Sequence, residues 1–191
     1  FGDENGNYYP VWSPDGRRLA FSSDRGHQGI YFKNSDGSGD ERPLYRQTRP
    51  DLPSDWSRDG SKLAITRNFP AGSALTVSLG DGKGAPSESA EENAAATPVF
   101  SPDGRWLAYT ALASAGSPAQ VIVRPLLGQG GKIQITSDGG AFPVWTDREI
   151  IFMSESKVFA IEAQTQPVFR PGARRELFES AYDRREMPLR D

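Results

Sequence analysis

The chain lacks cysteine altogether and contains a single histidine, His27, among its 191 residues. Without cysteine there is no disulfide, no thiol nucleophile and no cysteine-ligated metal, although this absence names no compartment. A Ser-His-Asp triad would have to use His27, and no G-x-S-x-G motif accompanies it. His27 stands near Gly26 and Gly29 in a stretch typical of a loop between strands. The sequence therefore predicts a protein without catalytic machinery of its own.

Long apolar segments and a strong net charge are also missing. No apolar run approaches the roughly 18 residues of a membrane-spanning helix, and no signal-peptide pattern is present. The first residue is Phe1 and not methionine, so we expect a segment upstream. The formal net charge is −3, which gives no strong attraction to nucleic acid. We expect no membrane insertion by this segment and no nucleic-acid partner.

Turn-forming residues are abundant, with 20 glycines and 15 prolines, and they recur in a repeat. The segment PVWSPDGRRLAF returns as SDWSRDGSKLAI, as PVFSPDGRWLAY and, shortened, as PVWTDREIIF, at residues 10–21, 54–65, 98–109 and 143–152. One aromatic residue marks each copy, with spacings of 44, 44 and 45 residues: Trp12, Trp56, Phe100 and Trp145. A period of about 40–45 residues is typical of four-stranded β-propeller blades.

We therefore predict an all-β fold, a β-propeller of four-stranded antiparallel blades, as a single partial propeller over residues 1–191. Short apolar runs suit strands, and no segment keeps an apolar period of 3.6 residues. Residues 88–97 have a helix-forming composition where the outer strand of the second blade belongs, which predicts a degenerate edge or a surface loop. The predicted blades cover residues 10–53, 54–97, 98–142 and 143–188.

Propellers have roughly four to eight blades, and the known propeller repeats that these segments resemble occur in the larger ones. Four repeats account for most of the chain, so we expect it to be part of a ring of about six to eight blades. An open arc exposes the apolar faces of its terminal blades. We therefore expect self-association through these open blade faces.

The repeated Ser-Pro-Asp-Gly segment raises the question whether Asp15 has a chemical role or a role in turning the chain. Proline presets φ for a type I turn, aspartate bonds to the local backbone, and glycine takes a positive φ. A catalytic carboxylate has no reason to recur in every blade, so we assign these residues to turns. The turn set is Pro14, Asp15, Gly16, Asp59, Gly60, Pro102, Asp103 and Gly104, and the predicted blade-core aromatics are Trp12, Trp56, Phe100 and Trp145.

Other candidate sites are weaker. Asn34, Asp36 and Ser38 have the alternate spacing of a calcium-binding loop, but Tyr45 stands where the loop requires glutamate. The segment GDGKG at 80–84 lacks the ending of a phosphate-binding loop. We predict no metal and no cofactor. Two charged groups suit solvated surface: an acidic run of Glu88, Glu91 and Glu92, and arginines interleaved with acids at positions Arg170, Arg174, Arg175, Arg184, Arg185 and Arg190.

The repeated segment, with its continuation SSDRG and GIYF, resembles the PD40, or WD40-like, propeller repeat. That repeat occurs in TolB, in the tricorn protease, in prolyl-oligopeptidase-type peptidases and in the extracellular part of many bacterial Ser/Thr kinases. The resemblance covers nearly the whole chain, and residues 143–182 resemble the last blade of the kinase-linked propellers. The pattern departs from the repeat at Arg58, which replaces proline, and in the shortened fourth turn at 146–149.

The resemblance implies a non-catalytic scaffold that binds a protein, peptide or other ligand, as a sensory or interaction domain of a bacterial signalling or envelope protein. It implies a periplasmic or extracellular location. Binding is expected at the mouth of the central channel, where loops converge, with the contact residues unassigned. Two alternatives stay open: the gating propeller of a prolyl-oligopeptidase-type serine peptidase whose catalytic domain is absent, and a carbohydrate-active propeller with paired carboxylates.

Overall fold

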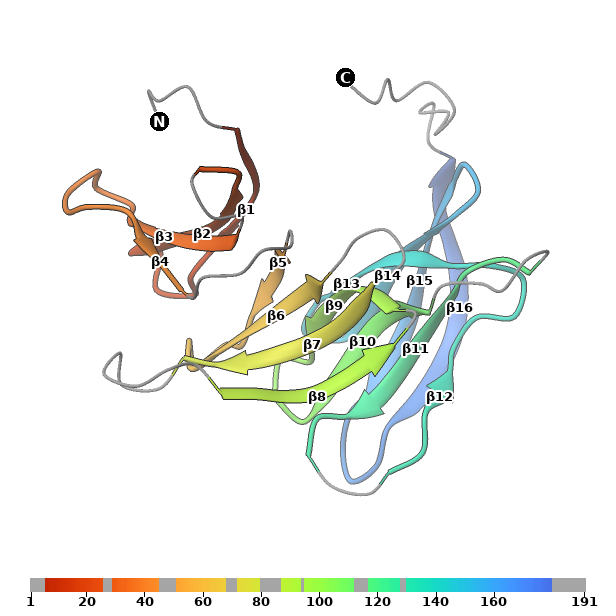
Figure 1. Cartoon of the computed structure of the whole chain (residues 1–191). Helices are drawn as coiled ribbons and strands as arrows, with labels where there is room; N and C mark the ends of the chain where they lie inside the picture. Colours follow the sequence, from red (N-terminus) through yellow and green to blue (C-terminus); the bar gives the residue numbers. More distant parts are fainter. Residues whose placement is uncertain are drawn as a thin grey trace.

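The computed structural model describes residues 6–25, 29–44, 51–67, 72–79, 87–93, 95–111, 117–127 and 130–179 (Figure 1). These residues form four antiparallel sheets of four strands each, and within every sheet the strands follow one another in chain order. The all-β class with four-stranded antiparallel sheets is thereby confirmed. No membrane-spanning helix occurs in the described ranges.

Each sheet is one blade, numbered in chain order. Blade 1 comprises β1 (Asn7–Trp12), β2 (Arg18–Ser23), β3 (Gly29–Asn34) and β4 (Arg42–Pro43), and blade 2 comprises β5 (Asp51–Trp56), β6 (Lys62–Arg67), β7 (Ser73–Ser78) and β8 (Ser87–Asn93). Blade 3 comprises β9 (Ala95–Phe100), β10 (Trp106–Ala111), β11 (Gln120–Pro125) and β12 (Ile133–Gln134), and blade 4 comprises β13 (Ala141–Trp145), β14 (Glu149–Ser154), β15 (Lys157–Gln164) and β16 (Arg170–Glu179). The first strands begin at residues 7, 51, 95 and 141, slightly before the predicted repeat starts.

Strand β8 differs from the expectation of a degenerate edge or loop. Residues Ser87–Asn93 pair antiparallel with β7 over almost their whole length. The free edge of β7 offers backbone donors and acceptors, and pairing satisfies those groups whatever the side chains prefer. A tertiary neighbour thus overrides the helix-forming composition of this stretch, and blade 2 has its outer strand.

The anchor aromatics join each blade to the blade before it. Trp56 is only 5% exposed, and its ring lies 5.5 Å from the Phe32 ring of blade 1. Its indole N–H donates to the carbonyl of Val11 at 3.3 Å. In the same way, the buried ring of Phe100 packs with Ala64 of blade 2. The apolar core of the molecule therefore lies mainly between successive blades and not inside any one sheet.

The exposure of Trp12 contradicts the prediction that all four anchor aromatics lie in blade cores. Trp12 occupies the same repeat position as Trp56, yet it is 60% exposed. An anchor is buried by the preceding blade, and no described residues form a blade before blade 1. Trp145, by contrast, packs partly buried against the apolar cluster that joins blades 3 and 4. Burial of an anchor thus depends on a neighbour and not on its own repeat.

Left-handed residues in the inner strands supply a second link between blades. Thr97 and Phe142, each directly before a proline, have φ of 50° and 55°, a conformation that costs roughly 1–3 kcal/mol. Their backbone N–H groups donate to hydroxyls of the preceding blade, Thr97 to Thr66 at 2.8 Å and Phe142 to Thr110 at 3.0 Å. These bonds offset the strain. In blade 2 the residue equivalent to Thr97 and Phe142 is Pro53, which has no N–H and a fixed φ.

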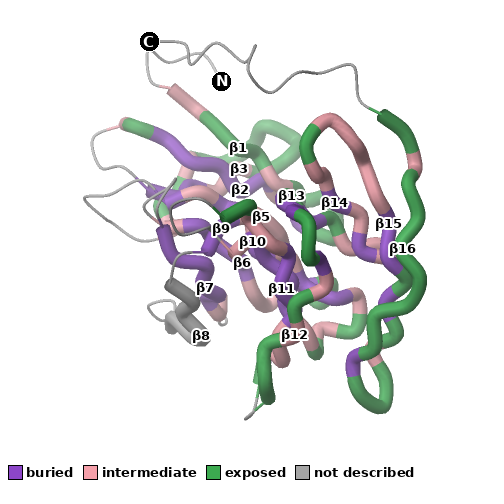
Figure 2. Tube along the Cα trace, turned by 90° about the vertical axis from the view of Figure 1, so that its right-hand side faces the viewer, coloured by how far each residue is buried: buried purple, intermediate pink, exposed green. Residues whose placement is uncertain are grey.

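The four blades make an arc (Figure 1). Contacts join blade 1 to 2, 2 to 3 and 3 to 4 along the inner strands, and within the described ranges blades 1 and 4 share no comparable interface. Among the described residues, no blade covers the outer side of blade 1 or the outer side of blade 4. Figure 2 shows that exposed residues run along most of the last strand, β16.

Candidate binding site at the blade turns

The turns between the first and second strand of each blade gather on one face of the arc, a surface we call the turn face. It consists of residues 13–17, 57–61, 101–105 and 146–148. Shared hollows join the turns of blades 1, 2 and 3, and the contact between Arg58 and Asp147 joins the turn of blade 2 to that of blade 4. The turn face is thus the place where four separated stretches of sequence come together.

The carboxylates of the turn aspartates accept hydrogen bonds from residues of their own turns. Asp15 Oδ1 accepts a hydrogen bond from the Ser13 hydroxyl at 2.7 Å and from the Arg17 N–H at 3.0 Å, and Gly16 closes the turn with φ of 67°. The pKa of Asp15 is lowered by these bonds. Asp59 accepts equivalent bonds from the Ser61 N–H and the Ser57 hydroxyl, which lower its pKa to about 2. Acids this strong are poor proton acceptors near neutral pH.

The fourth turn is closed by the hydrogen bonds of a hydroxyl side chain, without a glycine. The Thr146 hydroxyl accepts a hydrogen bond from the Glu149 N–H at 3.0 Å and donates to its carbonyl at 3.1 Å. Thr146 thus replaces the serine of the longer turns. The shorter connection leaves Asp147 with 79% of its side chain exposed, so this carboxylate faces solvent instead of its own turn.

Two hollows lie between successive turns. The first, of about 300 Å³, separates the turns of blades 1 and 2, and its lining includes Arg18 and Asp15. The second, of about 340 Å³, separates those of blades 2 and 3, and its lining includes Lys62 and Leu126. Arg58 and Asp59 line both hollows. Pro14 and Pro102 hold the position of Arg58 in the neighbouring blades, so the departure from the repeat adds a cation where the hollows meet.

Arg58 also reaches across the arc. Its guanidinium lies 3.1 Å from the carboxylate of Asp147 in blade 4, and 69% of its side chain is exposed. An exposed ion pair of this kind contributes only about 0–1 kcal/mol. A carboxylate of another molecule can therefore replace Asp147 at small energetic cost. The turn face thus offers a cation held in place by a weak, exchangeable partner.

Asp55 is a residue that the sequence-based assignment missed. It stands where the other repeats have Val11, Val99 and Val144, and it lies between blades 2 and 3. Its carboxylate accepts the backbone N–H of Phe100 at 2.8 Å and that of Trp56 at 2.8 Å. Burial raises its pKa to about 6, against the opposing effect of these two bonds. The signal in the sequence was a charged residue at a repeat position that is otherwise apolar.

The raised pKa makes the stability of the chain depend on pH through Asp55. The folded form binds a proton below about pH 6, whereas the unfolded form does so only near 3.8. This contribution to folding is therefore fully present below pH 3.8 and lost as the pH rises through 6. The shift corresponds to about 3 kcal/mol at most. We expect Asp55→Asn to gain stability relative to the natural chain between pH 4 and pH 7.5.

Urea unfolding of both proteins at the two pH values measures this effect. Any constant effect of the amide cancels in the difference between the two pH values, so only the titration contributes. An equal free-energy gap between natural chain and variant at both pH values would contradict the titration of Asp55.

The remaining candidates do not form a second site. Asp36 accepts from the Ser38 N–H, and the Asn34 amide donates to the Ser38 hydroxyl, so this hairpin uses its polar groups internally. Arg174 pairs with Asp138 and Arg175 pairs with Glu149. In the described part of the chain, no group of three or more metal-ligating side chains is brought together. His27, residues 80–84, and Arg184, Arg185 and Arg190 lie outside the described residues, and the side chains of Glu88, Glu91 and Glu92 are likewise not described.

Comparisons with known proteins agree with this architecture. No family model matches the sequence. A stretch of 59 residues, 30% of this chain, is 42% identical to the Tol-Pal system protein TolB of Alcanivorax borkumensis and covers 13% of that protein. The structure of a protein described as TolB from Agrobacterium tumefaciens superposes with a TM-score of 0.64 over 88% of this chain, at 21% sequence identity. The chain has a partial β-propeller fold of the TolB type.

The same comparisons limit what the fold can say about the activity of the chain. The TolB-type propeller described here spans 63% of the Agrobacterium tumefaciens protein, so it matches less than two thirds of that relative. Prolyl oligopeptidase B of Galerina marginata also shares the fold, with a TM-score of 0.55, 11% identity, and coverage of 92% of this chain but only 28% of the enzyme. The propeller fold alone therefore serves proteins of different activity.

Proposed function

We propose that this chain is a non-catalytic propeller domain that binds a protein or peptide partner at the turn face. The observation that carries the proposal is Arg58, which lines both hollows and whose present partner, Asp147, is weakly held. The turn aspartates support it, because hydrogen bonds with their own turns leave them poor general bases. A rigid scaffold that presents convergent loops is a common platform for recognition.

The partner is expected to offer a carboxylate. A carboxylate at Arg58 can take the place of Asp147 and form a charge-assisted, two-pronged contact with the guanidinium. The adjoining hollows can then receive neighbouring side chains, one beside Leu126 and one beside Arg18. An acidic peptide segment meets these requirements better than a neutral or basic one.

Fluorescence anisotropy with labelled synthetic peptides tests this proposal. The probes are three peptides of equal length, rich in Asp and Glu, rich in Lys, or uncharged. The acidic peptide is expected to bind, with an affinity that falls as ionic strength rises. Arg58→Ala is expected to weaken this binding roughly tenfold, since a hydrogen bond to a charged group contributes about 1.5–3 kcal/mol.

Lys157→Ala is the matched control. Lys157 pairs with Glu176 at 2.9 Å, and 42% of its side chain is exposed, but it begins β15, at the end of blade 4 away from the turns. Its loss should leave the anisotropy titration unchanged. Peptide binding that is insensitive both to Arg58→Ala and to salt, or equal binding of the three peptides, would rule out the turn face as the site.

We further propose that the domain belongs to an exported bacterial envelope or signalling protein. The named function of the Alcanivorax borkumensis relative, a Tol-Pal system protein, and the resemblance of the repeats to TolB-type propellers support a periplasmic or extracellular location. The likeness to the Galerina marginata enzyme supports a second candidate, a peptidase gate. Sequencing the adjoining reading frame distinguishes them: a G-x-S-x-G hydrolase domain supports the gate, whereas a kinase with a spanning helix, or a signal peptide with further blades, supports the binding domain.

A further inference from the structure

The connection between β15 and β16, residues 165–169, lies against the blade before its own. The Trp106 indole N–H of blade 3 donates to the carbonyl of Thr165 at 3.0 Å. Phe169 is 4% exposed, and its ring lies 5.4 Å from the Trp106 ring and 5.9 Å from the Trp145 ring. A short segment of the chain itself is therefore docked between blades 3 and 4, beside the turn of blade 3.

The turn aspartate of blade 3 takes part in this contact. Asp103 Oδ1 accepts hydrogen bonds within its own turn, from the Ser101 hydroxyl at 2.6 Å and from the Arg105 N–H at 3.1 Å. Burial raises the pKa of Asp103, but these bonds, with further ones from the side chains of Thr165 and Gln166, lower it overall. A turn aspartate therefore accepts donors from a docked segment while it keeps the bonds that close its own turn.

Trp106 has structural equivalents in blades 1 and 2. Arg18, Lys62 and Trp106 each begin the second strand of their blade. The backbone N–H of each donates to the hydroxyl of the serine five residues earlier, at 2.9, 2.8 and 2.9 Å. Each of these turns thus presents the same pair, an aspartate and the first residue of the second strand. In blade 3 the pair holds residues 165–169, whereas in blades 1 and 2 it lines the two hollows.

The hollow between blades 2 and 3 differs from the docked site in the chemistry that it offers. The indole of Trp106 is a single neutral donor, whereas Lys62 carries an ammonium group with three donors, which bonds more strongly to a carboxylate than to a neutral carbonyl. The bonds of Asp59 within its turn all go to Oδ1, so its second oxygen can accept a hydroxyl or amide donor. Leu126 also lines this hollow and supplies an apolar wall.

We propose that this hollow binds an extended peptide segment in which an acidic residue precedes Thr or Gln and an apolar residue follows three positions later. The acidic side chain pairs with Lys62, the hydroxyl or amide donates to Asp59, and the apolar side chain packs beside Leu126. The spacing of three is that of Gln166 and Phe169 in the docked segment. This inference rests on the proposed binding at the turn face and adds the sequence that is recognised there.

Fluorescence anisotropy of the full 191-residue chain with two labelled heptapeptides of equal charge is the first test. Glu-Thr-Gln-Pro-Val-Phe-Glu carries the side-chain donors, and Glu-Val-Met-Pro-Val-Phe-Glu replaces them with apolar side chains of similar size. The first peptide is expected to bind at least about tenfold more tightly, because the second cannot donate to the charged carboxylate. Lys62→Met is expected to weaken binding of the first peptide by a similar factor.

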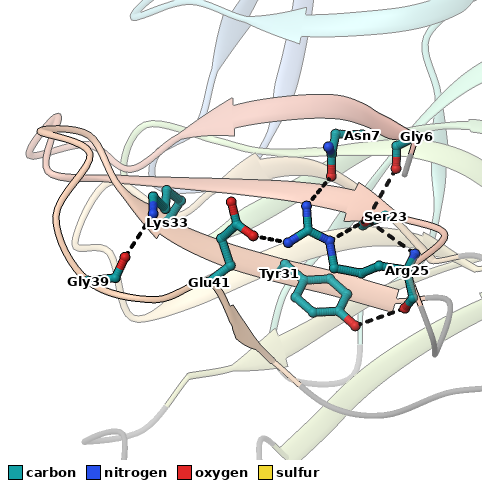
Figure 3. A network of polar contacts seen from close by, with 8 residues as sticks. All are labelled: Gly6, Asn7, Ser23, Arg25, Tyr31, Lys33, Gly39 and Glu41. Atoms are coloured by element: carbon teal, nitrogen blue, oxygen red, sulfur yellow. Dashed lines mark hydrogen bonds and ion pairs between the residues drawn. The ribbon is translucent and has the colours of Figure 1, made fainter. Parts of the chain in front are cut away.

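Lys33→Met is the matched control for Lys62→Met. Lys33 is half-buried like Lys62, but its Nζ donates to the carbonyl of Gly39 at 2.8 Å within blade 1 (Figure 3), and it lines neither hollow. Equal binding of the two peptides, with Arg58→Ala still weakening both, would overturn this inference and leave the proposed acidic-peptide site standing. If neither peptide bound, both proposals would fall.

An exchange of residues between blades tests whether the docks are equivalent. Lys62→Trp gives blade 2 the residue that blade 3 has at this position. A peptide copy of residues 164–170, Gln-Thr-Gln-Pro-Val-Phe-Arg, is expected to bind this variant at least about tenfold more tightly than the natural chain, because an indole N–H then meets its carbonyl. Circular dichroism checks that the variant folds. A folded variant with no gain in affinity for this peptide would refute the equivalence of the turns.

Discussion

Trp56→Ala is expected to lower the free energy of unfolding by about 3–5 kcal/mol, whereas Trp12→Ala changes it by no more than about 0.5 kcal/mol. The two residues occupy the same position of the same repeat. Trp56 is 5% exposed and Trp12 is 60% exposed, so only the first truncation removes packing against a neighbouring blade. The lost contacts include the Phe32 ring and the guanidinium of Arg18, which lies 5.2 Å from the Trp56 ring.

Urea denaturation followed by circular dichroism, at a concentration where the chain is monomeric, measures this contrast. The pair controls for residue type, because the same side chain is removed in both variants. Similar losses for the two would mean that the anchors stabilise their own blades and that burial between blades is not the main source of stability.

Arg67→Ala is expected to cost about 3–5 kcal/mol, because it leaves a buried carboxylate without its cation. Asp51 is fully buried, and its carboxylate lies 3.2 Å from Arg67 Nη2 and 3.3 Å from Nε. The double variant Asp51→Ala with Arg67→Ala is expected to recover most of the loss. Blade 3 supports this expectation, since Ala95 and Ala111 form the same cross-strand pair there.

Thermal and urea unfolding of the natural chain, both single variants and the double variant complete a double-mutant cycle. A positive recovery in the double variant identifies the pair as interdependent. If the double variant lost the sum of the two single losses, the ion pair would have no coupling, and the cost would have to come from packing of the individual side chains.

The sequence was sufficient to predict the repeat unit, the all-β class and the turns, because these depend on local rules that each copy restates. Glycine at positive φ and aspartate bonding back to the turn are local requirements, visible in three copies. The four sheets follow from the period of 44–45 residues. Strand β8 was missed because its strand character comes from pairing with β7 and not from its own composition.

Contacts between blades could not be predicted from the repeat alone. The burial of each anchor depends on the blade before it, which is why Trp12 and Trp56 differ. Asp55 gains its role from the Phe100 N–H, 45 residues later in the chain. Arg58 was visible as a departure from the motif, but its partner, Asp147, follows 89 residues later. Long-range partners of this kind are set by the curvature of the arc, which no single repeat encodes.

The one-way packing of anchors also determines how the molecule can be built during translation. Domains emerge from the ribosome from the N-terminus onward. Of these four blades, blade 1 leaves before the others and presents Val11 and Phe32 before Trp56 has been synthesised. Blade 2 in turn is complete before Phe100 leaves the ribosome. Each new blade thus finds the preceding blade already formed. Its anchor aromatic lies in its first strand, which is the first part of the blade to be synthesised. Synthesis in this order lets the arc grow one blade at a time, without waiting for the end of the chain.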